Sequence, residues 1–146
     1  MEYEFSITRL MIKDHSKLLD LLNNLEEKSK ENFISVKKAF LKFKWELEKH
    51  IFIEEKAIFT DYNPIDITEG YKMLPEITKQ HNYMINILNN WEKDVRKNHQ
   101  LTDIYSFKQF LINHRIYEER KVYPKLDASL NDEQKKQIVE KITEII

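Results

Sequence analysis

Apolar residues recur along most of this chain at the i, i+3, i+4, i+7 spacing that places them on one face of an α-helix. Pro75 suits the first turn of a helix, and Pro124 is expected to end one. The pattern therefore predicts four long helices: Thr8 to Lys28, Phe33 to Phe59, a third that begins near Pro75 and continues past Trp91, and Thr102 to Tyr123.

The segments between these helices are polar or contain residues that interrupt helices. Lys28–Asn32 and Lys97–Gln100 are polar, and Thr60–Gly70, expected as the main connection, contains Asn63-Pro64 and the only glycine. The last segment, Asn131–Ile146, carries several isoleucines on one side. It is predicted to form a short helix that docks on the other helices or on a partner chain.

Composition supports an all-helical fold. The 146 residues include one glycine and three prolines, and the Asn-Gly and Asp-Gly pairs typical of hairpins are absent from the sequence. We therefore expect a single domain over residues 1–146. Its expected fold is all-α: an up-down-up-down four-helix bundle with a short C-terminal helix.

Charge and cysteine content exclude several classes of function. The 24 basic and 25 acidic residues nearly cancel, unlike the charge of a dedicated nucleic-acid binder. Without cysteine the chain has no disulfides, thiolate nucleophiles or cysteine-ligated clusters. No apolar run approaches the roughly 20 residues of a membrane span. The expectation is a cytoplasmic protein that binds neither nucleic acid nor membrane.

An internal repeat pairs the histidines. His15 is followed by SKLLDLLNNLE and His81 by NYMINILNNWE, at an offset of 81 − 15 = 66. The segment HIFIEEKAIF begins at His50 and HRIYEERKVY at His114, at an offset of 114 − 50 = 64. The chain therefore reads as two copies of one helical hairpin, each with a lone histidine followed by a His-x-x-x-Glu pair.

The second half of each copy presents an imidazole and a carboxylate one helical turn apart. His50 precedes Glu54 by four residues, and His114 precedes Glu118 by four, so each pair lies on one helix face. These faces are the apolar stripes, where an unpartnered carboxylate costs several kcal/mol. Because neither stripe carries an obvious inward Lys or Arg, two metal ions would supply the compensating charge.

The ordinary interpretation of one histidine on an apolar stripe is a hydrogen-bonded core residue. Four such histidines in duplicated contexts, two of them with matched carboxylates, favour a metal site instead. Imidazole with carboxylate suits iron or manganese better than calcium, which prefers oxygen ligands alone. Zinc would not need a duplicated cage for two metals.

These residues resemble the hemerythrin-like (HHE cation-binding) family over essentially the whole chain, from Asp14-His15 through the HIFIEE and HRIYEE segments. The resemblance implies a four-helix bundle holding a non-haem di-iron centre with an oxo or hydroxo bridge. It implies one terminal histidine ligand on each of the four helices: His15, His50, His81 and His114. It also implies that Glu54 and Glu118 are carboxylates that bridge the two irons.

The pattern departs from that of the oxygen-carrying hemerythrins, which have five histidine ligands, two of them four residues apart on the third helix. Here the positions four residues either side of His81 are Ile77 and Ile85. The arrangement resembles more closely the iron–sulfur-cluster-repair proteins and the iron- and oxygen-sensing members. Fewer histidine ligands leave open metal positions, where dioxygen, peroxide or nitric oxide would bind.

Three functions fit this pattern. The first is a di-iron protein that binds or reacts with a diatomic ligand or peroxide in sensing, detoxification or iron handling, with or without catalytic turnover. The second is an iron donor for cluster repair, although the chain lacks the cysteine-bearing N-terminal region frequent in repair proteins. The third is a helical interaction module stapled by its metals. The apolar C-terminal segment could in addition form a homodimer.

Several nearby residues have open roles. His99 lies in a polar link and is expected to be exposed. Glu55 and Glu119 follow the two predicted bridging glutamates and would be either outer partners that orient an imidazole, alternative ligands, or surface charges. Tyr83 and Tyr117 would either contact a bound oxygen species or pack in the core.

Overall fold

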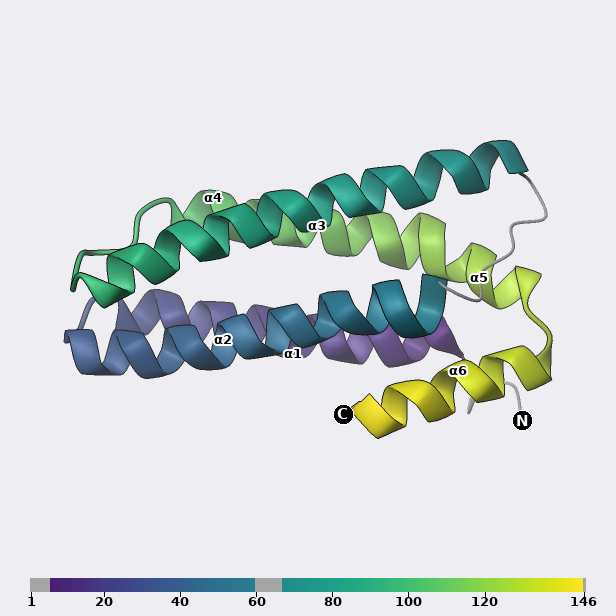
Figure 1. Cartoon of the computed structure of the whole chain (residues 1–146), viewed down its shortest axis with the longest axis horizontal. Coiled ribbons are helices and arrows are strands. Elements are labelled where there is room, and N and C mark those ends of the chain that lie inside the picture. Colours follow the sequence, from purple (N-terminus) through teal and green to yellow (C-terminus); the bar gives the residue numbers. More distant parts are fainter. Residues whose placement is uncertain (1–5, 60–66, 146) are drawn as a thin grey trace.

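The computed structural model describes residues 6–59 and 67–145, and all regular structure in these ranges is helical (Figure 1). The prediction of an all-α fold is therefore confirmed. Five-residue π-helical segments follow two of the α-helices at Glu54–Ile58 and Glu118–Val122. The α-helices are α1 (Ile7–Lys28), α2 (Phe33–Ile53), α3 (Ile67–Arg96), α4 (Ile104–Tyr117), α5 (Tyr123–Ser129) and α6 (Asp132–Ile145).

Helices α1 to α4 run lengthwise along the molecule, and α6 runs beside one end of them, slightly tilted (Figure 1), where it packs against α2 and the π-helical segment that follows α2. Helix α1 packs against α2 and α4, and α3 packs against the same two helices from the other side. Each long helix thus has two long neighbours, so the apolar stripes predicted from the sequence face a shared interior.

Polar side chains fix where the first two helices begin. The Ser6 hydroxyl accepts a hydrogen bond from the Arg9 N–H, and Asn32 does the same for the Ser35 N–H at the start of α2. Asp127, on α5, accepts hydrogen bonds from the backbone N–H groups of Ile7 and Thr8. Helix α1 is therefore capped from a segment about 120 residues away in the sequence.

The core consists of two apolar clusters separated by a polar layer. One cluster occupies the half of the molecule that includes Phe43, Leu88 and Phe107, and the other joins the ends of the long helices to α5 and α6 around Ile58 and Leu126. On α1, α3 and the path from α4 into its π-helical turn, the predicted ligands fall between the two clusters in sequence. On α2, His50 and Glu54 flank Ile51 of the first cluster and Ile53 of the second. This placement separates the polar layer from solvent on both sides.

The second predicted helix is continuous to Ile58, but its last turn is π-helical. The prediction that Pro124 ends the fourth helix is wrong. The π-helical segment after α4 closes with the Tyr123 N–H donating to the Glu118 carbonyl, and Pro124 then lies in the first turn of α5. A proline is tolerated there because its missing N–H is not needed, so the helical path continues to Ser129.

The third helix begins at Ile67, eight residues before the predicted start near Pro75, which lies inside the helix. A proline inside a helix removes one backbone hydrogen bond, and here the buried Met73 and Ile77 on either side hold the helix in place. Of the predicted Thr60–Gly70 connection, residues 67–70 are helical and 60–66 lie outside the described residues.

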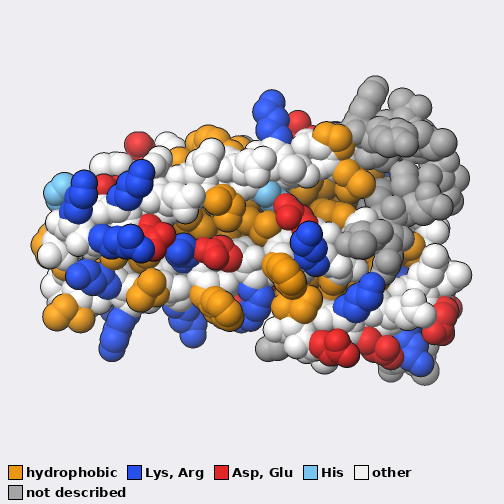
Figure 2. Space-filling view, viewed as in Figure 1, with side chains coloured by type: hydrophobic (Ala, Val, Ile, Leu, Met, Phe, Trp, Pro, Cys, Tyr) orange, Lys and Arg blue, Asp and Glu red, His pale blue; other side chains and the backbone are white. Residues whose placement is uncertain are grey.

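The predicted C-terminal helix is present as α6 and docks on its own chain. Ile138 and Ile142 are buried in the cluster that includes Ile58 and Leu126. On the molecular face shown in Figure 2, charged side chains of both signs are interspersed with apolar ones. Within residues 6–59 and 67–145, no helix is long and apolar enough to cross a membrane.

Candidate metal centre

The six predicted ligands meet in the polar layer between the two apolar clusters. Helices α1, α2, α3 and α4 each contribute one histidine, and the first residue of each π-helical segment contributes a glutamate. All six side chains are at most 2% exposed: His15, His50, Glu54, His81, His114 and Glu118. The site is therefore sealed from bulk water.

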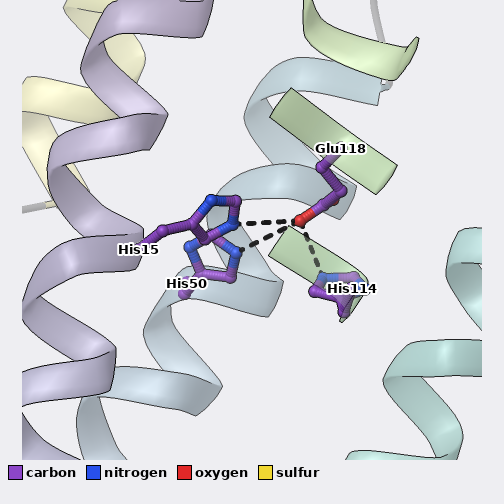
Figure 3. Close-up of side chains that lie close together, drawn as sticks. All are labelled: His15, His50, His114 and Glu118. Carbon is purple, nitrogen blue, oxygen red and sulfur yellow. Dashed lines mark hydrogen bonds and ion pairs between the residues drawn. The ribbon is translucent and has the colours of Figure 1, made fainter. Parts of the chain in front are cut away.

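Three imidazoles converge on the Glu118 carboxylate, as Figure 3 shows. Glu118 Oε1 lies 3.1 Å from His15 Nε2, 2.7 Å from His114 Nε2 and 3.8 Å from His50 Nε2. These three nitrogens come from three different helices. One carboxylate oxygen thus links both halves of the repeat.

The Glu54 carboxylate has a matching environment. Glu54 Oε1 lies 2.7 Å from His50 Nε2, 3.2 Å from His81 Nε2 and 4.0 Å from His114 Nε2. The repeat in the sequence is therefore reproduced as an approximate two-fold arrangement of donors in space.

The imidazole rings form two pairs, one from each hairpin. The centroids of the His15 and His50 rings are 4.8 Å apart, and those of His81 and His114 are 5.4 Å apart. We call the space served by His15 and His50 position A, and the space served by His81 and His114 position B. Glu54 and Glu118 lie beside both positions.

The donor atoms fit metal ions. Two overlapping groups, each of four side chains with ligand atoms within 4.8 Å of one another, include all six residues. Two ligands at about 2.1 Å from one metal and at a right angle stand about 3 Å apart, close to the shortest separations here. Among the described residues, the buried Glu118 Oε2 has no hydrogen-bond partner, and His50 Nε2 and His114 Nε2 have none beyond their ion-pair contacts of 2.7 Å with Glu54 Oε1 and Glu118 Oε1. Metal coordination would satisfy these atoms.

Glutamates hold the outer nitrogens of two imidazoles. His15 Nδ1 lies 3.1 Å from Glu119 Oε2, and His81 Nδ1 lies 3.1 Å from Glu55 Oε1. With Nε2 turned to the site, the Nδ1–H group donates to these carboxylates and fixes the ring. Of the alternatives open from the sequence, the structure favours outer partners. Arg115 Nε also donates to Glu119 Oε2, at 2.7 Å.

The other two imidazoles have outer partners that the sequence analysis missed. His50 Nδ1 lies 2.5 Å from Asp14 Oδ2, and His114 Nδ1 lies 2.5 Å from Gln80 Oε1. The Gln80 Nε2 group donates to Glu76 Oε1, which orients the amide so that its oxygen faces the imidazole. Asp14 directly precedes His15, and Gln80 directly precedes His81, the lone histidines of the two hairpins. These matching positions were the feature of the sequence that could have indicated the outer partners.

Tyr123 is a further residue of the site that the sequence analysis missed. It is fully buried, its hydroxyl donates to Glu54 Oε2 at 2.9 Å, and its ring stacks on that of His15. Burial, together with the carboxylates of Glu118 and Glu54, raises the pKa of Tyr123 well above its ordinary value. The hydroxyl therefore keeps its proton at neutral pH.

The other candidates lie elsewhere. His99 is exposed, as predicted. Tyr83 is 44% exposed and packs against Phe110, and Tyr117 packs against the apolar cluster near α5 and α6. Tyr117 therefore matches the core-packing interpretation, whereas Tyr83 lies at the surface and fits neither interpretation drawn from the sequence.

The electrostatics of the site suit cations. Burial lowers the pKa of His50, but the carboxylates of Glu54, Asp14 and Glu118 outweigh burial and hold it well above its ordinary value. Burial alone would raise the pKa of Glu118. The imidazoles of His114 and His15 have the larger, opposite effect, so the pKa of Glu118 lies well below its ordinary value. The Glu118 carboxylate thus stays ionised and requires positive charge beside it, from protonated imidazoles or from metal.

Comparison with known proteins agrees with this geometry. Residues 6–140 match the family model described as the hemerythrin HHE cation binding domain. Searches of curated proteins and of solved structures gave no match.

Proposed function

Because the chain belongs to the hemerythrin HHE cation-binding family, we propose that its buried centre holds two iron ions and binds or reacts with small oxidants such as dioxygen, peroxide or nitric oxide. The observation that carries this proposal is the set of six buried side chains, four imidazoles and two carboxylates, whose ligand atoms form two overlapping groups with members within 4.8 Å of one another. Such a cluster is costly unless cations compensate the two carboxylates.

In this proposal the chain is an up-down-up-down four-helix bundle of two similar hairpins. His15 and His50 hold the ion at position A, His81 and His114 hold the ion at position B, and Glu54 and Glu118 bridge them. Imidazole and carboxylate together suit iron, with manganese and zinc less suited.

The donor count leaves room for a small ligand. Four imidazole nitrogens and four carboxylate oxygens provide eight donor atoms, fewer than the twelve positions of two octahedral ions. Bound iron would supply open coordination positions and electrons for a small oxidant. This supports a reactive centre over one that only staples helices together.

The protein's own residues would select and orient the ligand. Because all six donors are at most 2% exposed, the site suits molecules of a few atoms rather than bulky substrates. The Tyr123 hydroxyl brings a proton donor to the Glu54 side of the site. The outer carboxylates and the Gln80 amide hold the imidazole rings in place.

Substitution of single donors tests the assignment. We expect His50→Ala and Glu118→Ala to lose about half or more of the iron and to lose the spectral response to peroxide, because each removes a buried donor. His99→Ala is the matched control, since His99 is exposed and outside the site. Retention of two metals per chain by either site variant would overturn the proposal.

A further inference from the structure

The two halves of the metal centre are related by the sequence repeat, and the repeat is broken next to the ligands. Positions 15 and 81 correspond at the offset of 66, so Asp14 corresponds to Gln80. A carboxylate therefore faces His50 at position A where a neutral amide faces His114 at position B. Both contacts join the same kind of imidazole atom, Nδ1, over the same 2.5 Å.

This difference affects how strongly each imidazole binds a cation. A carboxylate that accepts the Nδ1–H bond makes the opposite nitrogen a stronger donor and places a negative charge near the metal. An amide oxygen accepts the same hydrogen bond without the charge. Outer contacts of this kind change metal affinity by roughly 10- to 100-fold when they are altered.

The other outer partners do not cancel the difference. Glu119 and Glu55 occupy matching places in the two halves, 3.1 Å from His15 Nδ1 and His81 Nδ1. Arg115 takes some of the charge of Glu119, which weakens its effect at position A, whereas Glu55 is 41% exposed and weakened by solvent at position B. The contrast between Asp14 and Gln80 therefore remains.

We infer that the two metal positions are unequal, and that position A, held by His15 and His50, binds a divalent cation more tightly than position B. This inference rests on the proposed function, because it assumes that metal occupies the site. It adds that Asp14 and Gln80 set the order in which the two positions fill. At substoichiometric metal, the protein would hold one ion at A and leave B open.

The probe for this inference is Zn²⁺ alone, which carries no redox chemistry. Crystals of the full chain, stripped of metal and given one equivalent of Zn²⁺, would report the occupancy of each position by anomalous scattering. For a tenfold difference in affinity between independent positions, position A would hold about three quarters of the metal. Calorimetry would give the two dissociation constants.

Two isosteric designs narrow the difference in affinity, one by weakening position A and the other by strengthening position B. Asp14→Asn removes the charge at position A and should weaken the tighter binding step by roughly 10-fold or more. For position B, Gln80→Glu is combined with Glu76→Gln, so that residues 76 and 80 keep one amide and one carboxylate in reversed order. This pair of changes should strengthen the weaker step by a similar factor. Combining all three substitutions should make B the preferred position.

The outcomes separate the two proposals. Zn²⁺ bound equally at both positions in the native sequence, or a preference that the charge-swapped variants do not change, would overturn the inference and leave the proposed function standing. If the native chain binds no metal at either position, the proposed function itself fails. If Asp14→Asn does not fold, the Glu76→Gln, Gln80→Glu variant still tests the inference, because both side chains lie at the edge of the site.

Discussion

Tyr123 brings a hydroxyl into a layer that consists otherwise of imidazoles and carboxylates. Its counterpart at the offset of 64 is Phe59, so only the second half of the repeat supplies this group. The hydroxyl lies 2.9 Å from Glu54 Oε2 and 3.5 Å from His15 Nε2. It thus places a proton donor beside position A.

Replacement of this hydroxyl should separate metal binding from reactivity. We expect Tyr123→Phe to retain its iron, since none of the six proposed ligands changes, and to react with peroxide roughly tenfold more slowly or worse, since a proton donor is lost. The metal-free variant should also be about 1–3 kcal/mol less stable, because the Glu54 carboxylate loses a buried partner. Stopped-flow absorption and urea unfolding measure these effects. Tyr83→Phe is the control, and equal peroxide rates for Tyr123→Phe and the native chain would contradict this role.

The six donors could be predicted from the sequence because each stands on an apolar stripe and recurs in the repeat. Asp14, Gln80 and Tyr123 could not be assigned in the same way. Their contacts depend on the rotation of each helix and on which hairpin faces which, and these properties arise from packing of the whole chain. Glu55 and Glu119 remained ambiguous for a similar reason, since a charge next to a ligand can face either the site or solvent.

At the scale of the elements, π-helical turns follow both His-x-x-x-Glu pairs. Each begins at a glutamate proposed to bridge the two ions, Glu54 or Glu118, and adds one residue to the turn. Such turns widen the helix where a side chain must be redirected, and they occur often at functional sites. After the π-helical turn at Glu118–Val122, the helical path continues through Pro124 into α5. A prediction based on a regular α-helix therefore ended the fourth helix too early.

The cap on α1 couples the start of the chain to α5. The Asp127 carboxylate accepts hydrogen bonds from the Ile7 and Thr8 N–H groups and from the Thr8 hydroxyl, at the positive end of the helix dipole. We expect Asp127→Ala to lower the free energy of unfolding by about 1–2 kcal/mol, with metal content unchanged. Denaturant unfolding beside an Asp132→Ala control would measure this, and an unfolding midpoint equal to that of the native chain would show that the cap contributes nothing.

At the scale of the whole molecule, the apolar clusters on either side hold the charged layer together and shield it. His50 and His81 both have pKa values raised above 6.5, because nearby carboxylates outweigh the effect of burial. Protonation of these two histidines therefore contributes fully to stability when the pH is below their unfolded-state pKa of about 6.5. That contribution is lost as the pH rises through their raised pKa values in the folded state. Glu118, with a lowered pKa, contributes above about 4.5 and loses its contribution as the pH falls.

This linkage predicts opposite pH responses for the metal-free and metal-loaded protein. The melting temperature of EDTA-treated protein should fall as the pH rises above about 6.5, since the protonated imidazoles that compensate the carboxylates are lost. Metal affinity should increase over the same range, because metal ions compete with protons for the imidazoles. Melting curves from pH 5 to 9, with and without added Fe²⁺, would show this. A metal-free protein whose melting temperature rose steadily over that range would contradict it.

The proposed function requires a buried centre that holds two iron ions and reacts with small oxidants. The most direct test is the iron content per chain of protein purified from iron-supplemented cells, read together with its visible spectrum in air before and after peroxide. A protein with this centre should carry close to two irons per chain and show an absorption band that changes when peroxide is added. A chain with little or no iron, or a colourless zinc form that peroxide leaves unchanged, would contradict it.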